Sequence, residues 1–369
     1  MRILHFFKTA LPDTMGGIEQ VIHQISRGAP RLGVTCEVLS LSTAPTPATI
    51  TMEGYNVHRV KQDFNIASTG FSLQAISKFR ELAKNADIIN YHFPWPFMDL
   101  VHFLTRPGKP SVLSYHSDIV NQKNLLKLYS PIQNRFLKAV DRIIVSSPNY
   151  LDSSPVLREF KQKAEIIPIG LDKQSYPSTS PELLAKWKAV TGPKFFLFIG
   201  VLRYYKGLHI LLEALQNNDF PVVIIGNGPK EQELKAQAIK LGLKNVLFLG
   251  RLPDEDKAAL LTLCYSVVFP SHLRSEAFGI TLLEGAMYGK PMISCEIGTG
   301  TTFININNET GIAVPPANAQ ALSTAMRTLW NNPETAASMG KRAEQRYWQY
   351  FTADKMVRSY VDVYKDILK

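Results

Sequence analysis

The sequence has little cysteine and no long apolar run. Its 369 residues include three cysteines, which stand far apart with no Cys-x-x-Cys spacing: Cys36, Cys264 and Cys295. We therefore expect reduced thiols and a cytoplasmic protein rather than a disulfide framework. No run of about 18 apolar residues occurs, so no membrane-spanning helix is expected. Residues 1–8 fit a buried strand better than a targeting signal, because polar side chains interrupt the apolar stretch.

Several motifs of nucleotide chemistry are also missing. No Gly-x-x-x-x-Gly-Lys-Ser/Thr loop occurs, which argues against a P-loop kinase or ATPase. The first apolar run is not followed by Gly-x-Gly-x-x-Gly, and the later loop 226–229 lacks a third glycine, so a dinucleotide dehydrogenase loses its main support. We find no zinc finger and no RNA-recognition signature. Basic residues never form a run of five, so nucleic acid is not an expected partner.

Charge and composition describe a folded, basic protein. Lys and Arg number 41 against 31 Asp and Glu, a net charge of +10, while 45% of residues are apolar. An excess spread this thinly fits a small anionic substrate or an anionic membrane surface.

Short apolar runs alternate with helical patterns along the whole chain, which predicts βαβ units and parallel sheets. The ten expected strands are 3–7, 36–41, 87–91, 112–116, 142–146, 195–199, 222–225, 246–249, 267–269 and 292–294. A segment rich in proline and serine, 171–181, separates two series of five. We therefore predict an α/β fold of two Rossmann-like domains facing a central cleft, 1–172 and 173–351, with a last helix at 352–369 returning to the first domain.

The second half holds the charged residues best placed for chemistry. Arg203 and Lys206 follow a predicted strand, where two cations could hold a diphosphate. Glu276 and Glu284 flank Gly279, which precedes an apolar helix. One carboxylate then lies in the loop and one within the helix, with the free N–H groups of the helix N-terminus between them.

In the first half, Gly16 and Gly17 open a helix after the first strand, where backbone N–H groups could approach an anion, although a flexible turn explains them as well. His116 closes a predicted strand and could donate a hydrogen bond to a sugar hydroxyl or act as an acid or base. Three other histidines, His5, His92 and His102, have equally thin support.

Three further segments allow two interpretations each. Asp254–Asp256 has the spacing of a metal-binding pair, yet acids at a helix start simply complement its dipole. The aromatic loop 94–98 could contact a lipid or glycan acceptor, or be ordinary packing. Residues 119–140 carry four basic and no acidic residues among apolar ones, a pattern of a membrane-surface helix or of a solvated helix face.

Taken together, Glu276-x7-Glu284, the preceding loop 226–229 and the Gly200…Lys206-Gly207 turn resemble the family 4 retaining glycosyltransferases of the GT-B fold. The resemblance implies a sugar-nucleotide donor, a glycan or lipid-linked acceptor, and a reaction that retains anomeric configuration without a bound metal or other cofactor. It implies that His116 contacts the donor sugar and that Arg203 and Lys206 neutralise the leaving diphosphate. Glu276 would hold sugar hydroxyls, and Glu284 the ribose. The full donor-binding set that it implies is Gly16, Gly17, Arg203, Lys206, Gly226, Leu252, Glu276, Ala277, Phe278, Gly279, Ile280 and Glu284, and the catalytic set is His116, Arg203, Lys206 and Glu276.

Two departures from the family pattern bear on the donor. Val201 stands where many relatives have the arginine, and the turn after the last expected strand reads Gly298-Thr299-Gly300-Thr301 instead of Gly-Gly-x-x-Glu. The latter is similar to bacterial surface-polysaccharide mannosyl- and rhamnosyltransferases, which favours GDP-mannose as donor and lipopolysaccharide or O-antigen assembly as the setting. The alternatives are a UDP-sugar donor, a GT-B-fold epimerase or hydrolase, and a non-catalytic nucleotide-sugar-binding assembly subunit.

Overall fold

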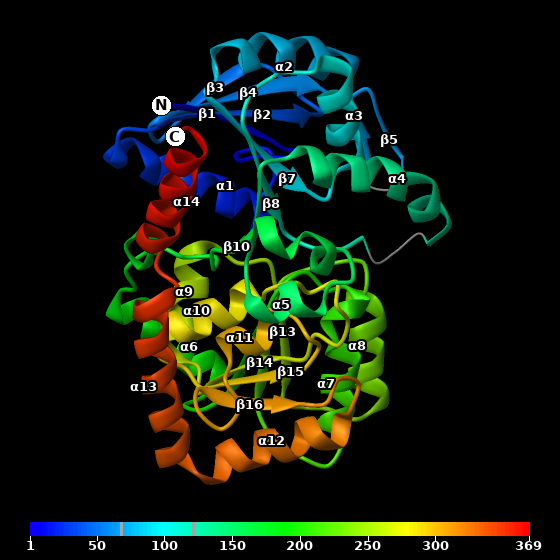
Figure 1. Cartoon of the computed structure of the whole chain (residues 1–369). Helices are drawn as coiled ribbons and strands as arrows, with labels where there is room; N and C mark the ends of the chain where they lie inside the picture. The colour runs from blue at the N-terminus through cyan, green and yellow to red at the C-terminus, as the bar shows by residue number, and fades with distance from the viewer. Residues whose placement is uncertain (67–68, 120–122) are drawn as a thin grey trace. The chain divides into compact units, whose positions relative to one another are not determined.

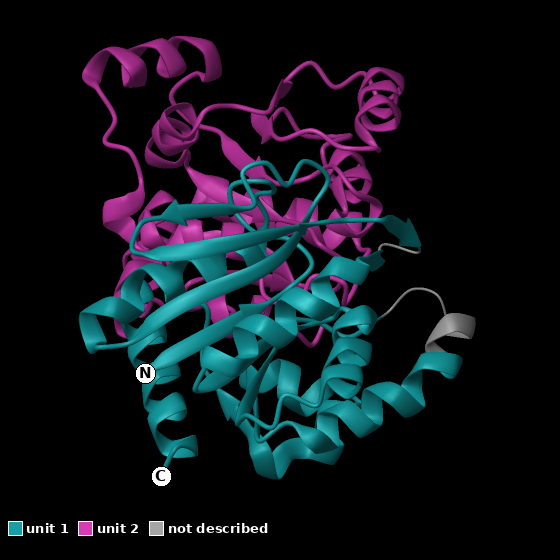
Figure 2. Ribbon diagram, turned by 90° about the horizontal axis from the view of Figure 1, so that it is seen from above, with its two compact units in different colours: residues 1–170, 353–369 teal, residues 171–352 magenta. Residues whose placement is uncertain are grey.

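The computed structural model describes residues 1–66, 69–119 and 123–369, with the side chains of 123–126 also left aside. The chain divides into two compact units (Figure 2). Unit 1 comprises residues 1–170 and 353–369, and unit 2 comprises residues 171–352. These divisions lie within two residues of the predicted ones. Leu171 marks the first of them, because its N–H donates to the carbonyl of Phe351 at 2.9 Å and so joins unit 2's two ends.

Unit 1 is built on an eight-stranded sheet of order β10-β9-β8-β7-β1-β2-β4-β3 (Figure 1). All its neighbours pair in parallel except β3 with β4. A short antiparallel hairpin, β5 with β6, stands apart from this sheet. The strands are β1 (Arg2–Phe6), β2 (Thr35–Ser42), β3 (Thr49–Met52), β4 (Tyr55–Lys61), β5 (Phe64–Ile66), β6 (Thr69–Phe71), β7 (Ile88–Phe93), β8 (Ser111–Tyr115), β9 (Arg142–Val145) and β10 (Ala164–Ile166).

The last helix of the chain belongs to unit 1. It packs against α1 along an apolar stripe that includes Met356, Val357, Tyr360 and Tyr364, all buried. The helices of unit 1 are α1 (Gly17–Gly28), α2 (Leu73–Asn85), α3 (Pro96–Thr105), α4 (Lys123–Ala139), α5 (Pro148–Ser153) and α14 (Ala353–Ile367), with short 3₁₀ turns η1 (Ala29–Leu32) and η2 (Leu157–Lys163).

Unit 2 has a wholly parallel six-stranded sheet of order β13-β12-β11-β14-β15-β16. Its strands are β11 (Phe196–Ile199), β12 (Val222–Ile225), β13 (Val246–Gly250), β14 (Ser266–Phe269), β15 (Met292–Cys295) and β16 (Gly311–Val314). Its helices are α6 (Pro181–Thr191), α7 (Leu208–Ala214), α8 (Glu231–Lys240), α9 (Asp254–Leu263), α10 (Ile280–Met287), α11 (Thr301–Ile304), α12 (Ala319–Asn331) and α13 (Pro333–Tyr350), with 3₁₀ turns η3 (Lys173–Ser175) and η4 (Tyr204–Lys206).

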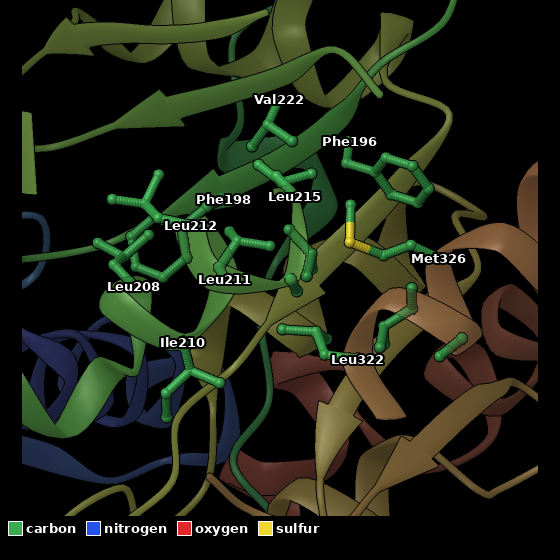
Figure 3. Close-up of a cluster of buried hydrophobic side chains, with 14 of the residues drawn as sticks. Phe196, Phe198, Leu208, Ile210, Leu211, Leu212, Leu215, Val222, Leu322 and Met326 are labelled. Carbon is green, nitrogen blue, oxygen red and sulfur yellow. The ribbon is translucent and has the colours of Figure 1, made fainter. Parts of the chain in front are cut away.

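A continuous apolar core lies between this sheet and helices α7, α8, α12 and α13 (Figure 3). Phe196 and Phe198 of β11 meet Leu211 and its neighbours on α7, and Met326 reaches the same cluster from α12. Strands buried on both faces read as unbroken apolar runs, which is why β11 and β12 were predictable. The buried β11 thus leads directly from the core to the loop that carries Arg203 and Lys206.

All ten predicted strands are present, with ends shifted by at most two residues. The prediction missed six strands, of which β4 lies within the sheet of unit 1. Its sequence includes His58 and Arg59, both buried, and polar side chains hide a strand from a search for apolar runs. Arg59 is satisfied there by the carboxylate of Asp13, with its Nε 3.0 Å from Oδ2.

Cys36, Cys264 and Cys295 are free and buried, and burial raises the pKa of each thiol. Among the helices of the described residues, none combines the length and the hydropathy that crossing a membrane requires.

Candidate functional site

Three loops converge at the carboxyl ends of the unit 2 strands β11, β12 and β14. A β-carbon on Gly226 would lie 2.0 Å from the carbonyl oxygen of Gly200, and one on Gly207 would lie 2.0 Å from that of Pro270. Gly226 and Gly207 also have φ of 126° and 71°, a region that favours glycine. The loops therefore pack backbone against backbone, which fixes the residues they carry relative to one another.

The central contact at this edge is an ion pair between two predicted residues. Lys206 Nζ, in η4, donates to Oε2 of Glu276, in the loop before α10, and both side chains are only 12% exposed. Ser271 Oγ donates to the same oxygen at 3.3 Å. Burial alone would lower the pKa of Lys206, but the Glu276 carboxylate and Tyr205 together hold the pKa above its usual value. The lysine therefore stays charged at neutral pH.

Arg203 supplies a second cation beside this pair. Its side chain is exposed, and in the described part of the chain its guanidinium forms no ion pair. Its positive charge opposes the rise in the Lys206 pKa, which nevertheless stays above the usual value. The edge thus carries one cation paired with a carboxylate and one cation facing solvent. Gly226 and Leu252 follow the neighbouring strands β12 and β13 at the same edge.

The start of α10 lies next to Glu276. Gly279 is its N-cap with φ 101°, and the preceding residues are held by Gly300, whose N–H donates to the Ala277 carbonyl at 2.9 Å. A β-carbon on Gly300 would lie 2.5 Å from the Phe278 ring, so only glycine permits this approach. The first N–H groups of the helix have no partner within it, and they carry its positive end. Ile280 opens that first turn.

Glu284 is buried in α10 with a 4% exposed surface. Tyr176 donates its hydroxyl to Oε1 at 2.8 Å, and Lys257 Nζ lies 3.3 Å from the same oxygen. Neither partner was predicted from the sequence, because Tyr176 lies in the predicted linker and Lys257 in a helix noted only for its acidic first turn. A charged residue on an otherwise apolar helix face is the signal that a partner must exist.

In unit 1, His116 follows β8 directly and is linked to another histidine. Its Nε2 atom lies 3.0 Å from Nδ1 of His92, which is fully buried on β7. Burial lowers the pKa of His116 to about 3, so its ring is neutral at pH 7. Val21 of α1 lines the same narrow cavity as His116. His102 lies apart, with its Nδ1 2.8 Å from the hydroxyl of Tyr91.

Gly16 and Gly17 begin α1, as predicted, with Gly16 as N-cap in an extended conformation. A β-carbon on Gly16 would lie 2.6 Å from Oε2 of Glu19. The carboxylate of Glu19 also accepts a hydrogen bond from Thr14 at 2.9 Å. This helix start therefore already holds a negative charge, which favours a hydroxyl over a phosphate as its ligand.

Two ambiguous segments have structural explanations. Trp95 is fully buried and donates its indole N–H to the Gly70 carbonyl at 3.0 Å, so the aromatic loop 94–98 is packing and not an exposed acceptor surface. Asp254 and Asp256 lie in the first turn of α9, and Asp256 accepts a hydrogen bond from the Trp187 indole at 2.7 Å.

The predicted basic helix is only partly within the described structure. Residues 120–122 and the side chains of 123–126, Lys123 among them, lie outside it. In the remainder of α4, Phe136 and Leu137 are buried, whereas Leu128 is 78% exposed beside the exposed Lys127. The C-terminal half of the helix therefore uses its apolar face for packing within unit 1.

Comparison with known proteins assigns this chain to a family. The model described as "Glycosyltransferase Family 4" matches residues 15–175, and "Glycosyl transferases group 1" matches residues 179–346. The chain is a glycosyltransferase of this family. The predicted family resemblance and the prediction of a glycosyltransferase are thereby confirmed, whereas retention of configuration stays a prediction.

Two relatives match this glycosyltransferase over nearly all of both chains. The D-rhamnosyltransferase WbpZ of Pseudomonas aeruginosa is 60% identical over 353 residues, which cover 96% of this chain and 93% of that one. The O-antigen chain mannosyltransferase C of Escherichia coli is 51% identical over 369 residues, covering 100% and 99%.

Solved structures agree on the architecture of the glycosyltransferase. Sucrose-phosphate synthase from Thermosynechococcus elongatus has a TM-score of 0.83 at 20% identity, over 100% of this chain and 99% of that one. The Anabaena protein HepE in complex with UDP has a TM-score of 0.78 at 20% identity, over 99% and 100%. At this identity the likeness shows the fold alone, the predicted GT-B fold of two Rossmann-like domains.

Proposed function

We propose that this glycosyltransferase moves a sugar of manno configuration, with GDP-mannose as donor, onto a glycan or lipid-linked glycan during O-antigen assembly. The relatives' names support the sugar: mannose and D-rhamnose share the manno configuration and differ only in the hydroxyl at C6. The E. coli relative's name supports the setting.

The Lys206–Glu276 pair is the observation on which the proposal rests. The bond that breaks joins the sugar to the diphosphate, and the pair offers a cation for the diphosphate and a carboxylate for the sugar. Lys206 has three N–H donors and can keep Glu276 while it donates to the diphosphate. Glu276 can accept hydrogen bonds from the sugar hydroxyls. Arg203, with no carboxylate partner in the described structure, adds charge where the diphosphate departs. Fixed cations and helix N–H groups stabilise the charge that develops in the transition state.

The reaction proposed is substitution at the anomeric carbon with retention. The bond between C1 and the diphosphate oxygen breaks, and a bond between C1 and the acceptor oxygen forms on the same face. The acceptor hydroxyl gives its proton to the departing diphosphate. No carboxylate is required as a nucleophile on the opposite face, which separates this scheme from the two-carboxylate glycosidase.

Two further contacts complete the proposed donor and acceptor sites. Glu284 accepts hydrogen bonds from the ribose through Oε2, since Tyr176 and Lys257 both contact Oε1. Gly16 and Gly17 receive an acceptor hydroxyl, because Glu19 makes their surroundings unsuited to a second phosphate.

We also propose that transfer requires no bound metal or other cofactor, because Arg203 and Lys206 supply the cations at the diphosphate. Transfer by the purified protein should therefore persist in excess EDTA. Loss of activity in EDTA, restored by a divalent cation, would contradict this part of the proposal.

For the protein's location, we propose a cytoplasmic enzyme that associates peripherally with anionic membrane through α4 and the adjoining α3. Two exposed leucines support this, Leu128 on α4, which follows the exposed Lys127, and Leu104 on the neighbouring α3. Vesicles containing anionic lipid should sediment the wild type at low salt but retain less of the double variant Leu128→Ser, Lys127→Glu. Equal sedimentation of both proteins, or of neither, would refute the surface.

The proposed function is tested by donor and product together. The full chain is supplied with GDP-mannose, GDP-D-rhamnose or UDP-glucose and a lipid-linked glycan acceptor, and the anomeric linkage is read by NMR. Transfer from a GDP sugar with α-linkage retained is expected. Transfer from UDP-glucose alone, release of free sugar without transfer, or an inverted linkage would each overturn it.

A further inference from the structure

Three histidines on neighbouring strands of unit 1 form a continuous hydrogen-bonded chain. His5 lies on β1, His92 on β7 and His116 just after β8, and these strands are adjacent in the sheet. His5 Nδ1 lies 3.0 Å from His92 Nε2, and His92 Nδ1 lies 3.0 Å from His116 Nε2. His5 and His92 are completely buried, whereas His116, at one end of this series of three histidines, is partly exposed.

The direction of these hydrogen bonds follows from Asn90. Its Nδ2 lies 3.2 Å from the carbonyl oxygen of Tyr91, which can only accept, so this atom of the amide is the nitrogen. The same nitrogen lies 3.1 Å from Nε2 of His92. This nitrogen has two N–H groups and a third neighbouring acceptor, Ser114 Oγ at 3.0 Å. We assign one N–H to Nε2 of His92, and on this assignment Nε2 carries no proton.

The remaining protons of the chain are then determined. A neutral imidazole has one N–H, so His92 is protonated at Nδ1 and donates to Nε2 of His116. His116 must in turn carry its own proton at Nδ1. Burial lowers the pKa of His5 and His116 to about 3, and burial also lowers that of His92, so all three rings are neutral at pH 7.

The C-terminal helix fixes the Asn90 amide from the other side. Tyr364 of α14 donates its hydroxyl to Oδ1 of Asn90 at 2.9 Å. Tyr360, one turn earlier, shares a hydrogen bond of 3.0 Å with Ser114 Oγ, which also lies 3.0 Å from Asn90 Nδ2. Asn90 is therefore held at both ends of its amide by residues distant in the sequence.

We propose that His92 and Asn90 are positioning residues that hold His116 in the tautomer protonated at Nδ1, so that His116 presents a neutral N–H to its ligand. Among the described residues, His116 Nδ1 has no hydrogen-bond acceptor, which leaves the N–H for an oxygen of the bound substrate. The inference rests on the proposed function for the identity of that substrate. His116 would then donate a hydrogen bond to a sugar oxygen. Because its Nδ1 already carries a proton, that atom cannot act as a general base.

The first experiment reads the tautomer directly and without activity. Wild-type protein labelled with ¹⁵N in histidine is studied by two-bond ¹H–¹⁵N NMR at pH 7, and His116→Gln identifies the His116 signals. A protonated Nδ1 and an unprotonated Nε2 on His116 are expected. The reverse tautomer, or a mixture of the two in wild type, would overturn the inference even if sugar transfer were established.

The second experiment compares two replacements of His92. His92→Asn places an amide N–H near the position of Nδ1, whereas His92→Leu has no donor. We expect His92→Leu to lose about 10-fold in kcat and to show mixed His116 tautomers, and His92→Asn to recover most of both. Equal loss in both folded variants, with the His116 tautomer unchanged, would show that His92 only fills space.

Two further variants keep this comparison decisive if His92→Leu fails to fold. Tyr364→Phe removes only the hydroxyl that orients Asn90, and about 3-fold lower kcat with a detectable second His116 tautomer is expected. His102 lies in the same unit but does not belong to the series of three histidines, so His102→Asn should change neither kcat nor the His116 tautomer. A tautomer unaffected by Tyr364→Phe would contradict the part assigned to Asn90. If no sugar donor supports transfer, the wild-type NMR result still decides the inference separately.

Discussion

The two units place polar residues at the same edge of a parallel sheet, but they do so with opposite electrostatics. Unit 2 uses full charges: Lys206 pairs with Glu276, and Lys257 pairs with Glu284. Unit 1 uses neutral rings, amides and hydroxyls, and its central residue, His116, has a pKa lowered to about 3 by burial. Unit 2 thus offers charges that suit an anionic group such as a diphosphate, whereas unit 1 offers neutral groups that suit uncharged hydroxyls.

The difference also explains why the two sites are held in different ways. An ion pair has a direction set by charge, so Lys206 and Glu276 need few neighbours to orient them. A neutral imidazole can exchange its donor for its acceptor, so its direction must be imposed by groups that only donate or only accept. Asn90 and Tyr364 perform that task in unit 1. The ion pair of unit 2 is therefore oriented by two charges, whereas the neutral imidazoles of unit 1 need several hydrogen-bond partners to fix their orientation.

The largest effect is expected from removal of the charged contact in unit 2. Lys206→Ala removes the cation that we propose binds the diphosphate and leaves the Glu276 carboxylate without its ion pair, and Glu276→Ala removes the proposed contact to the sugar. Each should lower transfer at least ~10²-fold, the scale for loss of one preorganised group. Steady-state rates with the sugar donor measure this.

Lys235→Ala is the matched control, since it removes a lysine from a surface ion pair with Glu231 in the same unit. It should retain near wild-type turnover. Near-normal turnover in folded Lys206→Ala would refute the charged site.

Acid should weaken unit 1 before unit 2. An unfolded histidine binds its proton near pH 6.5, but folded His5 does so only near 3, so the unfolded state binds more protons between these values and stability falls as pH falls. For His5 alone the loss at pH 5 is about 2 kcal/mol. Asp99, whose pKa burial raises, works in the opposite direction.

Peptide-resolved hydrogen exchange, corrected for the chemical rate at each pH, measures the two units separately. Protection in 1–170 should decline between pH 7 and 5 while that in 171–352 changes less. His5→Phe should flatten the decline in unit 1. Parallel decline in both units would remove the contrast drawn between them.

A smaller effect is expected at the buried carboxylate of α10. Glu284→Gln keeps an acceptor for Tyr176 but loses its charge, and Lys257 retains its ion pair with Asp254 at 3.2 Å. We expect KM for the donor to rise about 10-fold, with a lesser change in kcat, because the ribose is distant from the bond that breaks. Glu231→Gln on the surface is the control. A fall in kcat with unchanged KM would contradict ribose binding.

The smallest effect concerns the hydroxyl that supports Glu284. Tyr176→Phe removes one hydrogen bond of 2.8 Å while the Lys257 contact remains, so a rise of about 3-fold in donor KM is expected. Tyr350→Phe, exposed on α13, should leave KM unchanged. A 10-fold rise in Tyr176→Phe would mean that the hydroxyl touches the donor itself.

The sequence predicted the strands well and singled out Lys206 and Glu276, which the structure brings together, but it did not predict the contacts among neutral side chains. Glu276 and Glu284 were identifiable because a carboxylate beside an apolar helix has few structural reasons to exist. From the sequence His92 could not be distinguished from His102, because the role of a neutral histidine depends on which residues it contacts in the fold. Those neighbours include Tyr364, 274 positions from Asn90 along the chain, a separation that no local pattern can bridge. Strand β4 escaped for a related reason, because Asp13 satisfies its buried Arg59 from a distant loop.

The placement of α14 has a consequence for synthesis. Unit 2 is one uninterrupted segment, 171–352, whereas unit 1 needs residues 353–369 as well as 1–170. On the ribosome, unit 2 can therefore be complete while unit 1 still lacks Tyr360 and Tyr364. A chain cut short before α14 would therefore complete unit 2 but lack the Tyr364 hydroxyl that donates to Asn90.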